Sequence, residues 1–222
     1  MRLPSEPILA VVFDHDGLIF NTEELYQQVG TQLLARRGKT FDLELLDQIM
    51  GRPPQVSFPL MINYHGLTDT PEQLARESTE IFTGILDDQL QTMPGLLELL
   101  ELLEARQIPK AVGTSSGRRF VQKCLGKFEL EPRFEFLLTA EDVTHGKPDP
   151  EIYLAAARRL QVPPAQMLVL EDSQTGCRAA VAAGAYAVAV PGGHSLRHDF
   201  TGAAFIADSL ADPRIREVLG VG

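Results

Sequence analysis

The sequence of 222 residues has two cysteines, no tryptophan and no long apolar segment. Cys124 and Cys177 lie far apart and lack the spacing of a zinc site, which argues against a disulfide framework and favours a reducing, cytoplasmic setting. Nothing approaches the roughly 18 consecutive apolar residues of a membrane-spanning helix. Met1–Pro7 carries an acid and two prolines where a signal peptide has a basic and then an apolar stretch. We therefore expect a protein that neither spans a membrane nor is exported.

Basic residues are also under-represented, with 20 Lys and Arg against 30 Asp and Glu, so the formal net charge is −10. A nucleic acid would be repelled by this charge unless a local basic groove or a metal offset it. No run of Lys or Arg supplies such a groove. We expect no nucleic-acid partner.

Short apolar runs, alternating with stretches of helical pattern, predict buried parallel strands covered by helices on both faces. These runs are Ile8–Phe13, Pro109–Gly113, Phe136–Thr139, Met167–Leu170 and Tyr186–Val190. The predicted fold is α/β, with a doubly wound parallel sheet. In such sheets ligands bind beyond the carboxyl ends of the strands, so chemistry is expected just after each run.

The uneven spacing of the runs predicts an inserted helical domain, because roughly ninety residues separate the first run from the second. Thr70 and Gln73 have the spacing of a capping box at the start of one of its helices. We expect a core domain of residues 1–18 and 92–222 and a cap domain of residues 19–91, which should close over the site.

Gly51 and Arg52, in a cap loop, are the candidates for substrate contact. The alternative for this pair is a glycine that ends a helix beside a surface arginine.

Two carboxylates follow the first apolar run, in Asp14 and Asp16, with His15 between them and Gly17 after them. One carboxylate can act as nucleophile and metal ligand while the other moves protons. Asp and Gly are also common in turns, which is the alternative for this segment. His15 is expected to point the other way, as a packed or capping side chain.

Hydroxyl groups follow the second run, in Thr114, Ser115 and Ser116, just before a helical stretch. Hydroxyls and free amides at a helix N-terminus form a site for a phosphate. The alternative is that Ser116 only caps the helix.

The later segments add a cation and two further acids. Lys147 could neutralise a phosphoryl oxygen, although a solvated surface lysine is the default interpretation when this segment is taken alone. Glu171 and Asp172, after the fourth run, could bind a hard cation such as Mg²⁺ through oxygen, or Asp172 or Ser173 could cap a helix. Together the four segments supply a nucleophile, phosphate donors, a cation and metal ligands, which are the parts that phosphoryl transfer needs.

In order and residue type, these segments resemble the four motifs of the haloacid dehalogenase-like superfamily, namely FDHDG, VGTSS, HGKPDP and LEDS. The resemblance covers essentially the whole chain and is closest to the branch of β-phosphoglucomutase-like phosphatases, which carry a helical cap after the first strand. It implies a Rossmann-like core and a Mg²⁺-dependent phosphatase.

The resemblance also implies roles for single residues. Asp14 would be the nucleophile and Asp16 the acid/base, while Thr114 and Lys147 would bind the phosphate. Asp172 would bind the metal together with Asp14 and the carbonyl of Asp16.

Glu171 would either bind the metal itself or orient the residues that bind it.

In two places the sequence departs from the family. Asn21 stands where relatives carry Asp, and Asn caps a helix equally well. Tyr26 stands at a position where the β-phosphoglucomutase pattern carries a His, and this difference argues against mutase activity.

We therefore expect an enzyme that hydrolyses a small phosphorylated metabolite, a sugar phosphate or a nucleoside monophosphate, through an aspartyl-phosphate intermediate. A sugar phosphomutase is the main alternative. A dehalogenase would not need the second aspartate, Asp16. A non-enzymatic phospho-receiver module would carry its acids in another order along the sheet and would have no large cap.

Overall fold

The computed structural model describes residues 3–49 and 54–220. The chain divides into two compact units, of which one takes the residues up to Asn21 and from Gln91 onward and the other takes Thr22–Leu90. The chain leaves the first unit after Asn21 and returns to it at Gln91, and these two residues are hydrogen-bonded to each other. The Gln91 N–H donates to Asn21 Oδ1 at 2.8 Å, and the Asn21 N–H donates to the Gln91 carbonyl at 3.1 Å. We call the first unit the core unit and the second the cap unit.

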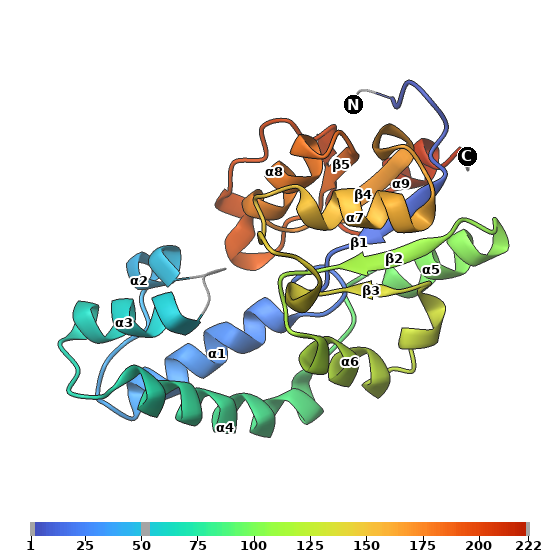
Figure 1. The fold of residues 1–222 in the computed structure, drawn as a ribbon. Coiled ribbons are helices and arrows are strands. Elements are labelled where there is room, and N and C mark those ends of the chain that lie inside the picture. Colours follow the sequence, from blue (N-terminus) through green and yellow to red (C-terminus); the bar gives the residue numbers. More distant parts are fainter. Residues whose placement is uncertain (1–2, 50–53, 221–222) are drawn as a thin grey trace. The chain divides into compact units, whose positions relative to one another are not determined.

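The core unit contains a parallel sheet of six strands in the order β3-β2-β1-β4-β5-β6 among the described residues (Figure 1). The strands are β1 (Ala10–Phe13), β2 (Lys110–Gly113), β3 (Leu137–Leu138), β4 (Met167–Glu171), β5 (Tyr186–Ala189) and β6 (Phe205–Ile206). All five predicted strands are confirmed, and so is the predicted fold class. β6 was missed because its two residues, one of them half exposed, make no apolar run.

The register aligns the carboxyl ends of the three central strands. Phe13, the last residue of β1, lies opposite Val112 of β2 on one side and Leu170 of β4 on the other. β1 is buried along its whole length. The residues that follow β1, β2 and β4 therefore emerge at one edge of the sheet.

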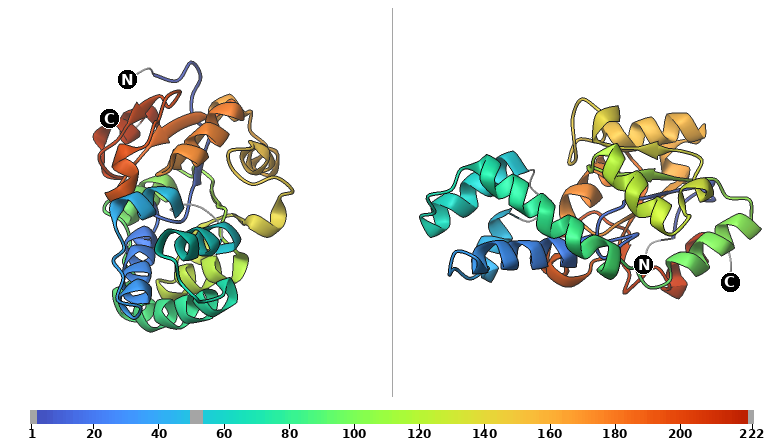
Figure 2. Two further views of the ribbon diagram at one scale, coloured as in Figure 1. Left: turned by 90° about the vertical axis from the view of Figure 1, so that its left-hand side faces the viewer. Right: turned by 90° about the horizontal axis from the view of Figure 1, so that it is seen from below.

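Helices flank this sheet in all views (Figure 2). They are α5 (Leu96–Ala105), α6 (Arg118–Lys127), α7 (Glu151–Leu160), α8 (Gln174–Ala182) and α9 (Pro213–Val218), with short 3₁₀ turns η1 (Glu131–Arg133), η2 (Ala140–Asp142), η3 (Pro164–Gln166) and η4 (Gly193–Arg197). Ile152 of α7 and Ala179 of α8 belong to one hydrophobic cluster with Val12 and Val169 of the sheet. α7 and α8 thus cover the same face of the central strands.

The cap unit consists of helices in its described residues: α1 (Thr22–Ala35), α2 (Leu43–Ile49), α3 (Pro54–His65) and α4 (Pro71–Gln89). Leu33, Leu45, Met61 and Leu74, one from each helix, lie in its core. The capping box predicted for Thr70 is confirmed at the start of α4. None of the helices in the described ranges is long and apolar enough to cross a membrane.

The two candidate substrate contacts in the cap, Gly51 and Arg52, lie outside the described residues. Their assignment stays a prediction.

Candidate active site

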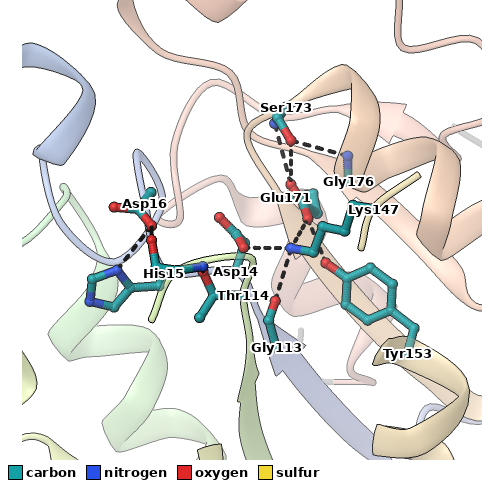
Figure 3. A network of polar contacts seen from close by, with 11 residues as sticks. Asp14, His15, Asp16, Gly113, Thr114, Lys147, Tyr153, Glu171, Ser173 and Gly176 are labelled. Atoms are coloured by element: carbon teal, nitrogen blue, oxygen red, sulfur yellow. Dashed lines mark hydrogen bonds and ion pairs between the residues drawn. The ribbon is translucent and has the colours of Figure 1, made fainter. Parts of the chain in front are cut away.

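The Lys147 side chain lies at the centre of a polar network beyond the ends of β1, β2 and β4 (Figure 3). Its Nζ donates to Asp14 Oδ1 at 2.5 Å, to Glu171 Oε1 at 2.6 Å and to the Gly113 carbonyl at 2.9 Å. The side chain is only 5% exposed, so the alternative of a solvated surface lysine is wrong. Burial alone would lower the pKa of Lys147, but the charges and hydrogen bonds of Asp14 and Glu171 raise it above its ordinary value. The ammonium is therefore charged at neutral pH.

Asp14 follows β1 directly and stays attached to the sheet, because its N–H donates to the Leu170 carbonyl at 3.0 Å. Burial raises the pKa of its carboxyl to about 7, with Lys147 acting against this rise and the charges of Glu171 and Asp16 adding to it. The nearby ammonium of Lys147 thus stabilises the ionised form of Asp14.

Asp14, Glu171 and Asp172 form a buried cluster in which one carboxylate oxygen of each lies within 4.8 Å of the others. An all-oxygen donor set of this kind fits a hard cation such as Mg²⁺ or Ca²⁺ and does not fit a thiophilic metal. The sequence placed all three residues at strand ends, and the structure brings them together. They could hold a metal ion.

Asp16 is held by Ser116, whose hydroxyl was a candidate phosphate contact or helix cap. The Ser116 hydroxyl donates to Asp16 Oδ2, and the residue that caps α6 is Gly117, so the capping alternative for Ser116 is wrong. His15 is packed, as expected, with its ring edge-to-face against Phe20 and Phe120.

His15 does not, however, point away from the carboxylates. Its Nδ1 lies 3.4 Å from Asp16 Oδ2, as Figure 3 shows. The strand β1 ends at Phe13, so side chains after it need not alternate between the two faces of the sheet. The His15 ring can therefore lie on the same side as Asp16.

Thr114, Ser115 and Lys147 line a cavity of about 190 Å³ within the core unit. These are the three residues predicted to bind phosphate, and the structure brings them to one place. The first amide of α6 is not free, contrary to expectation, because the Arg118 N–H donates to both carboxylate oxygens of Glu141 at 3.1 Å. The candidate phosphate contacts are therefore the hydroxyls and the lysine, with no contribution from this first amide; Asp14 does not line the cavity itself.

Sequence reasoning missed Tyr153 and the side-chain role of Ser173. The Tyr153 hydroxyl donates to Glu171 Oε1 at 2.5 Å, and the Ser173 hydroxyl donates to Glu171 Oε2 at 3.0 Å. Ser173 is also the N-cap of α8, as one of the sequence alternatives proposed. The signal for Tyr153 was weak, since an aromatic residue on the apolar face of a helix is indistinguishable from ordinary core.

Comparison with known proteins identifies the family. A family model described as haloacid dehalogenase-like hydrolase matches residues 11–190. The chain belongs to this family. Within it, the chain is 34% identical over 175 residues to the phosphorylated carbohydrates phosphatase of Thermotoga maritima, covering 79% of this chain and 81% of the relative.

Two further relatives of this hydrolase agree in fold and class. It is 32% identical over 185 residues to the fructose-1-phosphate phosphatase of Escherichia coli, covering 83% of this chain and 97% of that one. It is similar to the crystal structure of a haloacid dehalogenase-like hydrolase from Deinococcus radiodurans with bound phosphate and sodium, at 29% identity and a TM-score of 0.79 over 96% of both chains. The expected enzyme class, a phosphatase of this family, is confirmed.

Proposed function

We propose that this protein is a Mg²⁺-dependent hydrolase of a small phosphomonoester, either a sugar phosphate or a nucleoside monophosphate, which acts through a phosphoryl group on Asp14. The observation that carries the proposal is the buried contact between Lys147 Nζ and Asp14 Oδ1 beside two further acids. A nucleophilic carboxylate and a fixed cation within one hydrogen bond are what attack on an anionic phosphate requires.

The residues of the core unit account for both half-reactions. Thr114, Ser115 and Lys147 bind the phosphate, and Asp14 attacks phosphorus while the bond to the leaving oxygen breaks. Asp16 gives its proton to that oxygen, so the alcohol departs neutral and phospho-Asp14 remains. Asp16, now a carboxylate, takes a proton from water, which attacks phosphorus, releases inorganic phosphate and restores Asp14.

The proposed metal ligands are Asp14, Asp172 and the carbonyl of Asp16, with Glu171 beside them. When bound, Mg²⁺ would offset the repulsion between these carboxylates and the phosphate dianion. The chain's own cation, Lys147, contacts Asp14 and Glu171 and adds positive charge to the same group of acids.

The relatives support the substrate class by their names. The Thermotoga maritima and Escherichia coli proteins are named for phosphorylated carbohydrates and fructose 1-phosphate, respectively. A phosphate and a monovalent cation are bound in the Deinococcus radiodurans structure. A sugar phosphate is therefore the first substrate to test.

The experiment is a panel of phosphorylated metabolites with released phosphate as readout, in Mg²⁺ and with Asp14→Asn as control. We expect release from at least one sugar phosphate or nucleoside monophosphate by the parent enzyme and none by the variant, since an amide is nearly isosteric but a poor nucleophile. No release from any ester, or equal release by the variant, would contradict the proposal.

A phosphomutase with the same core is distinguished by its products. Tyr26, the residue that argues against it, stacks on Phe82 within the cap unit with ring centroids 4.7 Å apart. We expect free phosphate without any need for a sugar bisphosphate activator. An isomerised sugar phosphate as the main product would favour the mutase.

A further inference from the structure

Tyr153 has an unusual position for a core aromatic residue. It lies on α7, has no exposed surface, and its hydroxyl donates to Glu171 Oε1 at 2.5 Å. Its ring lies against the ammonium of Lys147, with Nζ 5.1 Å from the ring centroid. One side chain thus contacts both members of the Lys147–Glu171 ion pair (Figure 3).

The Glu171 carboxylate is saturated by donors from the protein. Oε1 accepts from Lys147 Nζ at 2.6 Å and from the Tyr153 hydroxyl at 2.5 Å. Oε2 accepts from the Ser173 hydroxyl at 3.0 Å and the Ser173 N–H at 3.3 Å. A carboxylate offers about four lone-pair sites, so these four donors compete with a metal ion for the oxygens of Glu171.

The backbone of α8 also fixes the Glu171 carboxylate. A Cβ built on Gly176 would lie 1.8 Å from Glu171 Oε1, so the carboxylate occupies space that only a glycine leaves open. Ser173 holds this first turn of α8 by accepting from the Gly176 N–H at 3.1 Å. The carboxylate cannot move toward α8, and the Tyr153 hydroxyl holds it on the side of α7.

We infer that the Tyr153 hydroxyl is a positioning group, which fixes Glu171 so that Glu171 holds Lys147 against Asp14 and stays outside the coordination sphere of the metal. This inference rests on the proposed hydrolysis. Asp14 and Asp172 are then the side chains that bind the metal directly. Glu171 orients the Lys147 ammonium, which contacts the phosphate. Burial, followed by the charge of Glu171, raises the pKa of Tyr153 well above its ordinary value, so the hydroxyl remains a donor.

Tyr153→Phe removes this one hydroxyl and keeps the ring. A freed oxygen on Glu171 becomes a possible ligand, which favours Ca²⁺, with its 6–8 oxygen ligands, over the octahedral Mg²⁺. Lys147 loses the fixed partner that aims it at Asp14. Because changes in groups that orient a metal site typically cost 10- to 100-fold, we expect kcat to fall about 10-fold with a smaller change in KM.

The test compares the parent enzyme, Tyr153→Phe and Tyr186→Phe, which makes the same chemical change at the amino end of β5, the sheet edge opposite to the site. Calorimetric titration with MgCl₂ and CaCl₂, without substrate, measures the preference for each cation. Turnover of p-nitrophenyl phosphate in Mg²⁺ gives kcat and KM. We expect Tyr153→Phe alone to shift the preference toward Ca²⁺ by about fivefold or more and to lower kcat.

A parent-like cation preference and kcat in a folded Tyr153→Phe would overturn the inference, even if its melting temperature fell, because that pattern belongs to packing alone. If Tyr153→Phe does not fold, Ser173→Ala frees the other oxygen of Glu171 and is judged by the same two readouts. An inactive parent enzyme would contradict the proposed hydrolysis instead, and the calorimetry, which needs no turnover, would still decide the inference.

Discussion

The buried ammonium of Lys147 and the two carboxylates that it contacts illustrate how a polar site is kept stable inside a protein. Removing charges from water costs several kcal/mol per ion, and the attraction between them repays this only when the geometry is good and the remaining lone pairs are bonded. Here both carboxylates accept from Nζ at 2.5–2.6 Å, and Tyr153 and Ser173 bind the rest of Glu171. The ammonium of Lys147 and the carboxylates of Asp14 and Glu171 are therefore stable in the interior only when all three are present.

Lys147→Met tests this dependence. It leaves Asp14 and Glu171 buried beside each other without a cation, so we expect a loss of about 3–5 kcal/mol in the free energy of unfolding in chelator. Adding Glu171→Gln should recover a substantial part of that loss, because one buried charge is then gone. Urea unfolding at pH 7.5 measures both variants. Equal stability of the single variant and the parent would show that the pair is not coupled.

At this scale the sequence identified the residues but not all of their contacts. Asp14, Thr114 and Asp172 could be proposed because each lies at the end of an apolar run, and parallel strands end at a common edge, whereas Lys147 was proposed from its place in the HGKPDP motif. The bond from Ser116 to Asp16 could not, because it joins two loops whose conformations have no periodic pattern.

Among the structural elements, the turn before α5 depends on one glycine. Gly95 has φ +85°, and a Cβ on it would lie 2.2 Å from the backbone nitrogen of Ala211. Both the left-handed conformation and the close approach exclude other residues. The start of α5 and the loop before α9 can therefore meet only through a glycine.

Gly95→Ala should lower the free energy of unfolding by at least about 2 kcal/mol, from backbone strain together with the clash. The matched control is Gly126→Ala on α6, where a Cβ meets nothing within 4 Å. It should be neutral or more stable by up to about 1 kcal/mol. Denaturant unfolding compares the pair, and equal losses in the two variants would contradict the steric argument.

Asp212 begins α9, where it accepts from the Arg214 N–H at 2.9 Å and pairs with the Arg214 guanidinium at 2.6 Å. Its hydrogen bonds with Arg214 lower the pKa of Asp212 from 3.8 to about 2. Because the folded-state pKa is depressed, the contribution to stability is complete above pH 4 and is lost as pH falls toward 2.

Asp212→Asn keeps a capping side chain and removes the charge. We expect it to be less stable than the parent by about 1–2 kcal/mol at pH 6, with the gap closing below pH 4. Urea unfolding across this range gives the two curves. A gap that stays constant down to pH 2.5 would mean that ionisation of Asp212 contributes nothing.

Elements with strong patterns were predictable and short ones were not. The five apolar runs gave the strands, and the side-chain cap and proline at the start of α4 gave its first residue. β6 has only two residues, so no periodicity could develop. The first residue of α5, Leu96, follows the left-handed Gly95, which no periodic pattern marks.

For the molecule as a whole, the net charge is −10, and the buried acids Asp14, Glu171 and Asp172 form a cluster that could bind a divalent cation. Phosphatase activity should vanish in chelator and return with Mg²⁺. A ligand that binds only the folded state stabilises it by RT ln(1 + [L]/Kd), about 2.7 kcal/mol at 100 times Kd. We therefore also expect Mg²⁺ to raise the melting temperature of the parent and to do so less in Asp172→Asn. Full turnover in chelator would rule out the metal.

The spacing of the strands predicts an inserted helical unit, but no motif in that unit predicts the substrate. Helical insertions of this kind bury their apolar faces against one another, as Leu33, Leu45 and Leu74 do, and this leaves a clear pattern. Recognition of a substrate leaves no such pattern, because it depends on single polar side chains without periodic spacing. The leaving group must therefore be found by experiment.

The central claim, that Asp14 carries the phosphoryl group and Asp16 moves the protons, can be tested by trapping the intermediate. p-Nitrophenolate leaves with little protonation, so Asp16→Asn should still form phospho-Asp14 from p-nitrophenyl phosphate. Its hydrolysis needs an activated water, and general-base help of this type is worth roughly 10²- to 10⁴-fold. The variant should therefore accumulate the acyl phosphate.

The measurement is rapid quench of Asp16→Asn with p-nitrophenyl phosphate and Mg²⁺, followed by intact-mass analysis in acid, with Asp14→Asn/Asp16→Asn as control. The account predicts a burst of nitrophenol near one equivalent per site and one added phosphoryl group, both absent from the double variant. Steady turnover near the parent rate without a burst or added mass, or a phosphoryl group that persists in the double variant, would contradict it.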